Sequence, residues 1–99
     1  MVEGKKNVLV CEDNKMVQNI MKALLTSLGA IPTITENGEE GVNAVKTEPA
    51  KYRCIFMDFL MPVKDGFEAA AEIRKIDPSI PIIGLSGGKS INCKNSFPF

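Results

Sequence analysis

The chain has 99 residues, of which 44% are hydrophobic and 24% are charged, a composition typical of one small globular domain. Twelve basic residues balance twelve acidic ones, so no net field attracts nucleic acid or an anionic membrane. No apolar run approaches the roughly 20 residues of a membrane span, and the first strand begins too early for a signal peptide. We expect a cytoplasmic or nuclear protein. Histidine is absent and the three cysteines form no C-x-x-C pair, which argues against zinc.

The chain begins with a strand and a helix. Residues 7–11 are continuously apolar, which predicts a buried parallel strand. Asp13 or Asn14 is placed to cap the helix that follows, and Gly29 is placed to end it. Apolar residues at helical spacing predict that one face of this helix is buried. They are Val17, Ile20, Met21, Leu24, Leu25 and Leu28.

A second strand and helix follow. Residues 30–35 predict a short strand, and Pro32 places it at a sheet edge because proline lacks a backbone donor. Asn37, with Glu40 three residues later, resembles a capping box and predicts the start of a helix. Pro49 ends that helix.

The last predicted unit runs from a strand at residues 54–57, through a helix, to a strand at residues 80–85. Asp65 starts the helix and Asp77, which precedes a proline, ends it. The residues expected to pack this helix inward are Phe67, Ala70, Ala71 and Ile73. Strict alternation of strands and helices predicts parallel strands with right-handed crossovers.

Acidic residues follow two of the predicted strands directly. Glu12 and Asp13 end the first strand, and Asp58 ends the strand at 54–57. In open α/β sheets the carboxyl ends of the strands form the ligand site, so we expect these carboxylates to converge there. Three neighbouring anions keep their charge only with a hard cation between them. The arrangement predicts Mg²⁺ and chemistry on a phosphoryl group.

Four sequence blocks in order resemble the receiver domain of two-component response regulators. They are residues 8–14, 37–40, 57–66 and 81–87. The resemblance implies a flavodoxin-like (CheY-like) doubly wound parallel sheet over residues 5–88, reduced to about four strands in the order 2-1-3-4 and followed by a divergent tail at 89–99. The Glu-Asp-Asn stretch at 12–14 is also similar to receivers of hybrid kinases and multistep relays.

The resemblance also implies a role for each site residue. Asp58 accepts a phosphoryl group from a phosphohistidine on a histidine kinase or phosphotransfer protein. Glu12, Asp13 and Asp58 hold Mg²⁺ together with the backbone carbonyl of Leu60. Ser86 donates its hydroxyl to a phosphoryl oxygen. Such a domain transfers a phosphoryl group to itself and is not an enzyme with a separate substrate.

Each residue also has a structural interpretation. Glu12 is placed to stabilise a helix start, and Asp13 to cap it. Ser86 precedes two glycines and fits a turn. Asp65 is more simply a helix cap than a site residue, and Lys64 is expected to be a solvated loop charge.

The chain departs from the family after residue 88. The family continues through a fourth helix, a fifth strand and a fifth helix, and the fifth strand ends in a lysine that pairs with the phosphoryl group. In the family a proline follows that lysine; the Phe97-Pro98 step of this chain is similar, but phenylalanine stands where the lysine would be. The last strand and helices are therefore expected to be missing or altered. Residues 80–85 then form an apolar edge strand, which predicts a dimer or swapped oligomer.

Two other functions remain open. A receiver-like module without the lysine could compete for a kinase or phosphotransfer partner without being phosphorylated. A phosphatase of the haloacid dehalogenase type also uses a strand-end aspartate, but its second aspartate belongs two residues later, where this chain has Leu60.

Overall fold

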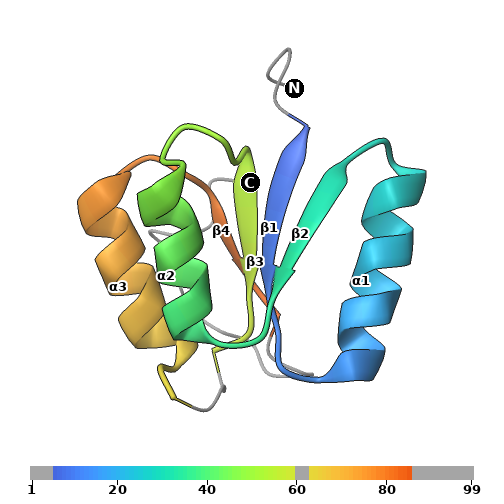
Figure 1. Ribbon diagram of the computed structural model, residues 1–99, viewed down its shortest axis with the longest axis horizontal. Coiled ribbons are helices and arrows are strands. Elements are labelled where there is room, and N and C mark those ends of the chain that lie inside the picture. The colour runs from blue at the N-terminus through green and yellow to red at the C-terminus, as the bar shows by residue number, and fades with distance from the viewer. Residues whose placement is uncertain (1–5, 60–62, 86–99) are drawn as a thin grey trace.

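The computed structural model describes residues 6–59 and 63–85, which form a parallel sheet with helices on both faces (Figure 1). Strands and helices alternate, as predicted. The elements are β1 (Asn7–Cys11), α1 (Lys15–Ser27), β2 (Ile31–Thr35), α2 (Gly38–Thr47), β3 (Cys54–Met57), α3 (Gly66–Ile76) and β4 (Ile82–Gly84). Among the described residues, none of these helices has the length and apolar character needed to cross a membrane.

The strand order is β2-β1-β3-β4, and all three neighbouring pairs are parallel. Both predictions are confirmed. Pro32 lies in β2, at one end of the described sheet, as its missing backbone donor requires. The chain moves outward from β1 to β2 and then returns to β3 on the other side of β1. This reversal places a switch point between the carboxyl ends of β1 and β3, where open α/β sheets bind their ligands.

The helices divide the core into two unequal parts (Figure 1). α2 and α3 cover one face of the sheet, and α1 covers the other. The larger cluster of buried side chains includes Leu9, Val42, Val45, Ile55, Ile73 and Ile82. The smaller cluster, on the α1 side, has three buried members, Val8, Val10 and Leu25.

Each helix begins at an Asn or Asp whose side chain accepts a backbone hydrogen bond three residues later. The three caps are Asn14 with the Val17 N–H (3.1 Å), Asn37 with the Glu40 N–H (2.9 Å) and Asp65 with the Glu68 N–H (2.9 Å). Gly29 follows α1 with φ +88°, a left-handed conformation that glycine adopts without a steric penalty. These predicted helix boundaries are confirmed.

The predicted buried face of α1 is wrong for three of its six residues. Leu25 is buried, and Val17 and Met21 are half-buried, but Ile20, Leu24 and Leu28 are exposed. The apolar arc of α1 is wider than the contact that the helix makes with the sheet, and no second helix of the described chain lies on this face.

Two smaller predictions also need correction. In α3, Gly66, Ala69 and Ile73 are the buried residues, whereas Ala71 is exposed and Phe67 is half exposed. The Phe67 ring nevertheless packs on Phe59, with ring centroids 4.5 Å apart. β4 covers Ile82–Gly84, which is shorter than the predicted strand, because it pairs with only three residues of β3.

Candidate functional site

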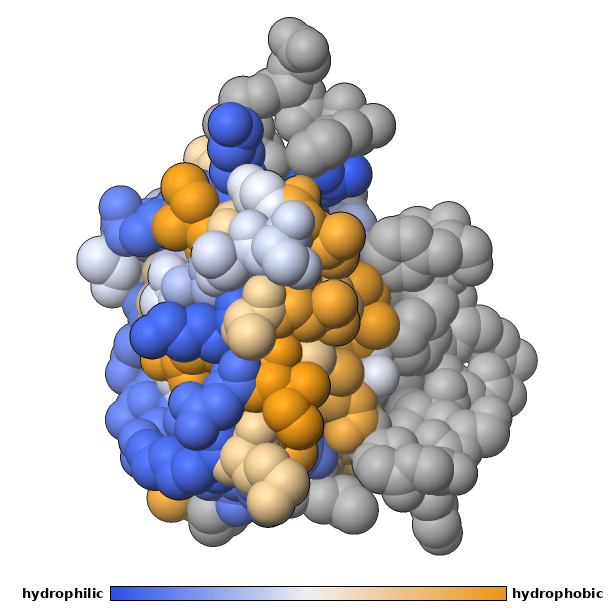
Figure 2. All heavy atoms as spheres, turned by 90° about the vertical axis from the view of Figure 1, so that its right-hand side faces the viewer, coloured by the Kyte–Doolittle hydropathy of each residue, from blue (hydrophilic) through white to orange (hydrophobic). Residues whose placement is uncertain are grey.

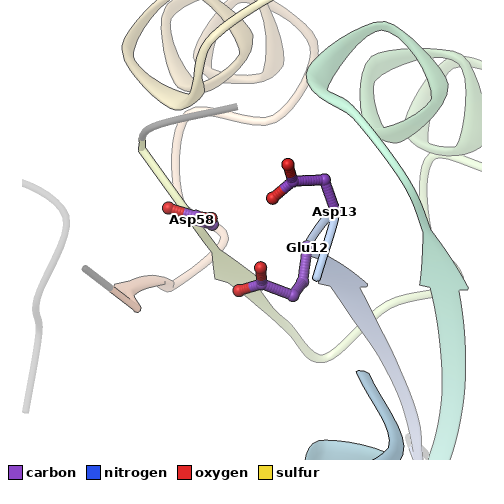
Figure 3. Close-up of side chains that lie close together, drawn as sticks. All are labelled: Glu12, Asp13 and Asp58. Atoms are coloured by element: carbon purple, nitrogen blue, oxygen red, sulfur yellow. The ribbon is translucent and has the colours of Figure 1, made fainter. Parts of the chain in front are cut away.

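Three carboxylates meet where β1 and β3 end (Figure 3). Glu12 and Asp13 follow β1 directly, and Asp58 follows β3. One carboxylate oxygen from each residue lies within 4.8 Å of the other two. The structure therefore brings together the three carboxylates that the sequence singled out.

Backbone hydrogen bonds hold two of these residues side by side at the carboxyl ends of adjacent strands. The register pairs Cys11 with Met57, so Glu12 and Asp58 are the next residues on adjacent strands. The Asp58 N–H donates to the Cys11 carbonyl at 2.9 Å, and the Glu12 N–H donates to the Thr35 carbonyl at 3.0 Å. These bonds extend the strand ladder by one residue into the site, so the backbone that carries the carboxylates is held by the sheet.

Glu12 is the most enclosed of the three, with 3% of its surface exposed. Its Oε2 atom accepts a hydrogen bond from the Asn14 N–H at 3.0 Å. The pKa of the Glu12 carboxyl is raised from 4.5 to about 7, mainly by burial and further by the nearby charges of Asp58 and Asp13, while the Asn14 bond opposes the shift. Ionised Glu12 is therefore costly in this cluster unless a cation neutralises it.

Sequence reasoning missed Gln18 as part of the site's support. Its Nε2 atom donates to the Glu12 carbonyl at 2.5 Å, and the residue is buried. Gln18 therefore ties α1 to the backbone of a site carboxylate. The sequence feature that could have identified Gln18 is its position: it is an amide residue within the apolar arc of α1, on the side of the helix that faces the sheet.

The three carboxylates fit Mg²⁺. Magnesium prefers hard oxygen ligands at about 2.0–2.1 Å, so two ligands on opposite sides of the ion are about 4.2 Å apart. The separation of up to 4.8 Å is close to that span, and a carboxylate slightly too distant can bind through one of the waters that Mg²⁺ retains. Burial is the main cause of the raised pKa of Glu12, and the charges of Asp58 and Asp13 add to it, so a cation at this place would favour the ionised carboxylate.

Gly66 allows the start of α3 to lie against the backbone of Asp58. Its N–H donates to the Phe59 carbonyl at 3.2 Å. A Cβ atom at this position would lie 2.4 Å from the Phe59 Cα and 2.6 Å from the Asp58 carbonyl oxygen. Any larger residue would displace the segment that carries the site aspartate.

Lys64 is not the solvated loop charge expected from the sequence. Its side chain is 20% exposed, and the ammonium group pairs with Glu39 of α2 and Glu72 of α3. The Lys64 carbonyl also accepts a hydrogen bond from the Gly38 N–H at 3.1 Å. Lys64 thus joins the segment before α3 to both helices on that face.

Two predicted site residues, Leu60 and Ser86, lie outside the described residues. The roles assigned to them stay predictions, as does the division of the chain at residue 88.

Comparison with protein families matches residues 8–96 to the response regulator receiver domain. Among curated proteins, the chain is 36% identical over 99 residues to a hybrid signal transduction histidine kinase of Dictyostelium discoideum. That match covers 93% of this chain but 6% of the kinase. The chain is also 38% identical over 87 residues to a two-component system protein of Emericella nidulans, and that match covers 87% of this chain and 13% of the relative. The chain therefore corresponds to a small part of these relatives.

Solved structures agree with this assignment. The receiver domain of a Pseudomonas aeruginosa sensor histidine kinase, solved with a magnesium ion coordinated in its active site cleft, is 30% identical and has a TM-score of 0.81. The match covers 94% of this chain and 76% of that one. A Saccharomyces cerevisiae response regulator receiver domain, co-crystallised with a histidine phosphotransfer protein, is 30% identical with a TM-score of 0.74, covering 97% of this chain and 71% of that one.

The strand order, the acidic cluster at the switch point and these matches agree on a CheY-like receiver fold, represented here by four described strands and three helices. The family match spans most of the chain. The chain belongs to the response regulator receiver domain family, whose members are phosphoacceptor signalling modules.

Proposed function

We propose that this chain accepts a phosphoryl group on Asp58 from a phosphohistidine of a partner protein, with Mg²⁺ held by Glu12, Asp13 and Asp58. The observation that carries the proposal is the convergence of these carboxylates, within 4.8 Å of one another, at the carboxyl ends of β1 and β3. The Leu60 carbonyl and the Ser86 hydroxyl complete the proposed site on the basis of the sequence resemblance.

The proposed transfer is a displacement at phosphorus. A carboxylate oxygen of Asp58 forms the new P–O bond while the P–N bond to the donor imidazole breaks, and the released imidazole nitrogen takes a proton from solvent. A bound Mg²⁺ supplies positive charge that reduces the repulsion between the carboxylate and the phosphoryl oxygens. The Asp58 N–H bond to Cys11 and the close approach of Gly66 hold the nucleophile in place.

The relatives support a histidine kinase or a phosphotransfer protein as the donor. The Dictyostelium relative is a hybrid histidine kinase, and the yeast relative was solved together with a phosphotransfer protein. We propose the same class of partner for this chain. A module that docks on such a partner without accepting the phosphoryl group is the alternative that the experiment must separate.

The test is to incubate the purified chain with Mg²⁺ and acetyl phosphate and to weigh the intact protein. We expect one added phosphoryl group, lost in Asp58→Asn and in the presence of EDTA. Asp65→Asn is the matched control, because asparagine also caps a helix and Asp65 lies outside the acidic cluster. This control should be modified like the unchanged chain.

A folded chain that gains no phosphoryl group would contradict the proposal. Binding to a phosphotransfer protein, measured on the same sample, then distinguishes the docking module from a protein with neither property. An adduct that persists in Asp58→Asn would place the modification on another residue and would also contradict the proposal.

A further inference from the structure

The two faces of the sheet differ in how completely the described residues cover them. Figure 2 shows apolar side chains gathered in a band on the side that carries α1, and nothing in the described residues shows what covers that band. On the other face, α2 and α3 lie side by side over the larger core cluster (Figure 1). Contacts on this face can therefore be followed from one helix to the next and on to the end of β3.

Lys64 is held by three contacts to these two helices. Its ammonium group lies 3.1 Å from a carboxylate oxygen of Glu39, in the first turn of α2, and also contacts the carboxylate of Glu72, in α3. Its backbone carbonyl accepts the Gly38 N–H at 3.1 Å. The hydrogen bonds to Glu72 and Glu39 raise the pKa of Lys64, and the bond from Lys64 lowers the pKa of Glu72, so both groups are charged at neutral pH. We call these three contacts the Lys64 clamp.

The Lys64 clamp lies two residues from the glycine that contacts the site aspartate. Gly66 donates its N–H to the Phe59 carbonyl, and a Cβ atom on Gly66 would lie 2.6 Å from the Asp58 carbonyl oxygen. The clamp is equally close to α2, because a Cβ atom on Gly38 would lie 2.3 Å from the Lys64 carbonyl oxygen. Both contacts join backbone to backbone, so a displacement of Lys64 would be transmitted through Gly66 to the backbone of Asp58.

Val63, directly before Lys64, has a backbone conformation that valine rarely adopts. Its φ of +70° is in the left-handed region, and it is the one residue other than glycine with a positive φ in the described part of the chain. Its side chain is 81% exposed, so packing of that side chain does not hold the conformation. A strained conformation persists only where neighbouring contacts fix it. The clamp on the next residue is such a restraint.

We propose that Lys64 is a positioning residue for phosphoryl transfer to Asp58. The clamp holds residues 63–65 in the conformation that keeps Gly66 against the peptide joining Asp58 to Phe59. When the clamp is lost, the strain at Val63 moves this segment and the site backbone with it. The inference rests on the proposed function, because it names a residue that supports that reaction.

The test compares the rate of phosphorylation, at saturating acetyl phosphate and Mg²⁺, with the thermal midpoint of the same protein. Lys64→Met keeps a long side chain but removes the charge, and we expect the reaction to slow about tenfold. The midpoint should change little, because ion pairs near the surface contribute little to stability. Lys64→Arg should keep most of the rate, because a guanidinium group also binds carboxylates.

Lys51→Met is the matched control. Lys51 also pairs with a glutamate, Glu48, at 3.1 Å. It precedes the amino end of β3, whereas the acidic cluster lies at the carboxyl end of that strand. Its replacement removes one ion pair and one positive charge, as Lys64→Met does, and should leave the rate of phosphorylation unchanged.

Two further variants separate the clamp from simpler explanations. The double variant Glu39→Gln, Glu72→Gln removes the ion pairs but makes the protein more positive. It should slow the reaction as Lys64→Met does, although the added positive charge favours the approach of acetyl phosphate. Val63→Gly allows the left-handed conformation without a steric penalty. Added to Lys64→Met, it should restore a large part of the rate, which a merely stabilising ion pair would not predict.

Four results would overturn the inference while the proposed function stands. The first is an unchanged rate in Lys64→Met. The second is a normal rate in the double glutamine variant, which would mean that the lysine acts through its charge on the donor. The third is a slow reaction that Val63→Gly does not restore, and the fourth is a loss of rate that follows the unfolded fraction. If the chain without substitutions gains no phosphoryl group, the proposed function fails and the inference fails with it.

Discussion

Glu12 is the residue whose ionisation depends most strongly on the fold. Burial and the charges of Asp58 and Asp13 raise its pKa to about 7, so much of it is protonated in the metal-free protein below neutrality. Mg²⁺ requires the ionised carboxylate, and its binding must release the proton. We predict that Mg²⁺ affinity rises with pH, by up to about tenfold per unit below pH 7, and levels off above it. Calorimetry between pH 5.5 and 8.5 measures this, and an affinity that is flat over that range would contradict it.

The same pKa shift determines the sign of a stability effect in the metal-free chain. Because the pKa of Glu12 is raised on folding, its stabilising contribution is fully present below the unfolded value near 4.5 and is lost as the pH rises through about 7. Glu12→Gln removes the charge but keeps the size of the side chain. This variant should be more stable than the unchanged chain at pH 8 without Mg²⁺, and it should no longer respond to the metal.

Gly66 is the glycine on which the position of Asp58 depends. In Gly66→Ala the new Cβ would meet backbone atoms, the Phe59 Cα at 2.4 Å and the Asp58 carbonyl oxygen at 2.6 Å, and neither can rotate away. We predict a loss of about 1–3 kcal/mol in the free energy of unfolding, together with slower phosphorylation. Urea denaturation measures the first effect. Ala71→Gly, at an exposed position of the same helix, is the control and should cost about 1 kcal/mol with no effect on phosphorylation.

Lys64 shows where residue-level prediction from sequence reached its limit. A lysine beside Asp65 in a loop gives no local signal of an ion pair. Its partners, Glu39 and Glu72, come from two different helices and meet it only once α2 and α3 pack side by side. The site carboxylates were predictable because each directly follows a strand. The ties that Lys64 and Gln18 make depend on distances between elements, which the local pattern does not contain.

At the scale of elements, the helix boundaries were more predictable than the helix faces. The Asn and Asp caps act within three residues, so the sequence contains all the information they need. Burial depends instead on which neighbours reach a helix. The periodicity of α1 predicted an apolar face that includes Leu24, but a wide apolar arc says nothing about how much of it the sheet covers.

The cap of α1 can be tested separately from the site beside it. Asn14 accepts the Val17 N–H through its side chain, and its own backbone N–H donates to Glu12. Asn14→Ala removes the first bond and keeps the second. We predict a loss of about 1 kcal/mol in stability with Mg²⁺ affinity nearly unchanged. Asn19→Ala, at an exposed position within α1, controls for the side chain and should change stability little. A large loss of Mg²⁺ binding in Asn14→Ala would show that the cap also positions Glu12.

At the scale of the whole molecule, the sheet order explains why the acidic cluster exists. Alternating strands and helices predicted parallel strands with right-handed crossovers, and the resemblance to receiver domains supplied the order β2-β1-β3-β4. That order places β1 beside β3, and the residues that follow them therefore share one edge of the sheet. Repulsion among Glu12, Asp13 and Asp58 opposes folding, since the extended chain separates Asp13 from Asp58 by 45 positions.

Mg²⁺ should therefore act as a folding ligand as well as a reagent for phosphorylation. A ligand at about 100 times its dissociation constant stabilises the folded state by about 2.7 kcal/mol, and the thermal midpoint should rise accordingly. Without metal, Asp58→Asn should be more stable than the unchanged chain, because one anion is removed. With Mg²⁺, its stability should increase much less than that of the unchanged chain. Thermal unfolding of both proteins, with and without Mg²⁺, measures the four midpoints. Equal increases of the midpoint with Mg²⁺ in both proteins would mean that the ion stabilises the fold somewhere other than the acidic cluster. A higher midpoint of Asp58→Asn without metal, together with a smaller increase on adding Mg²⁺, would show that the same three carboxylates oppose folding and bind the ion.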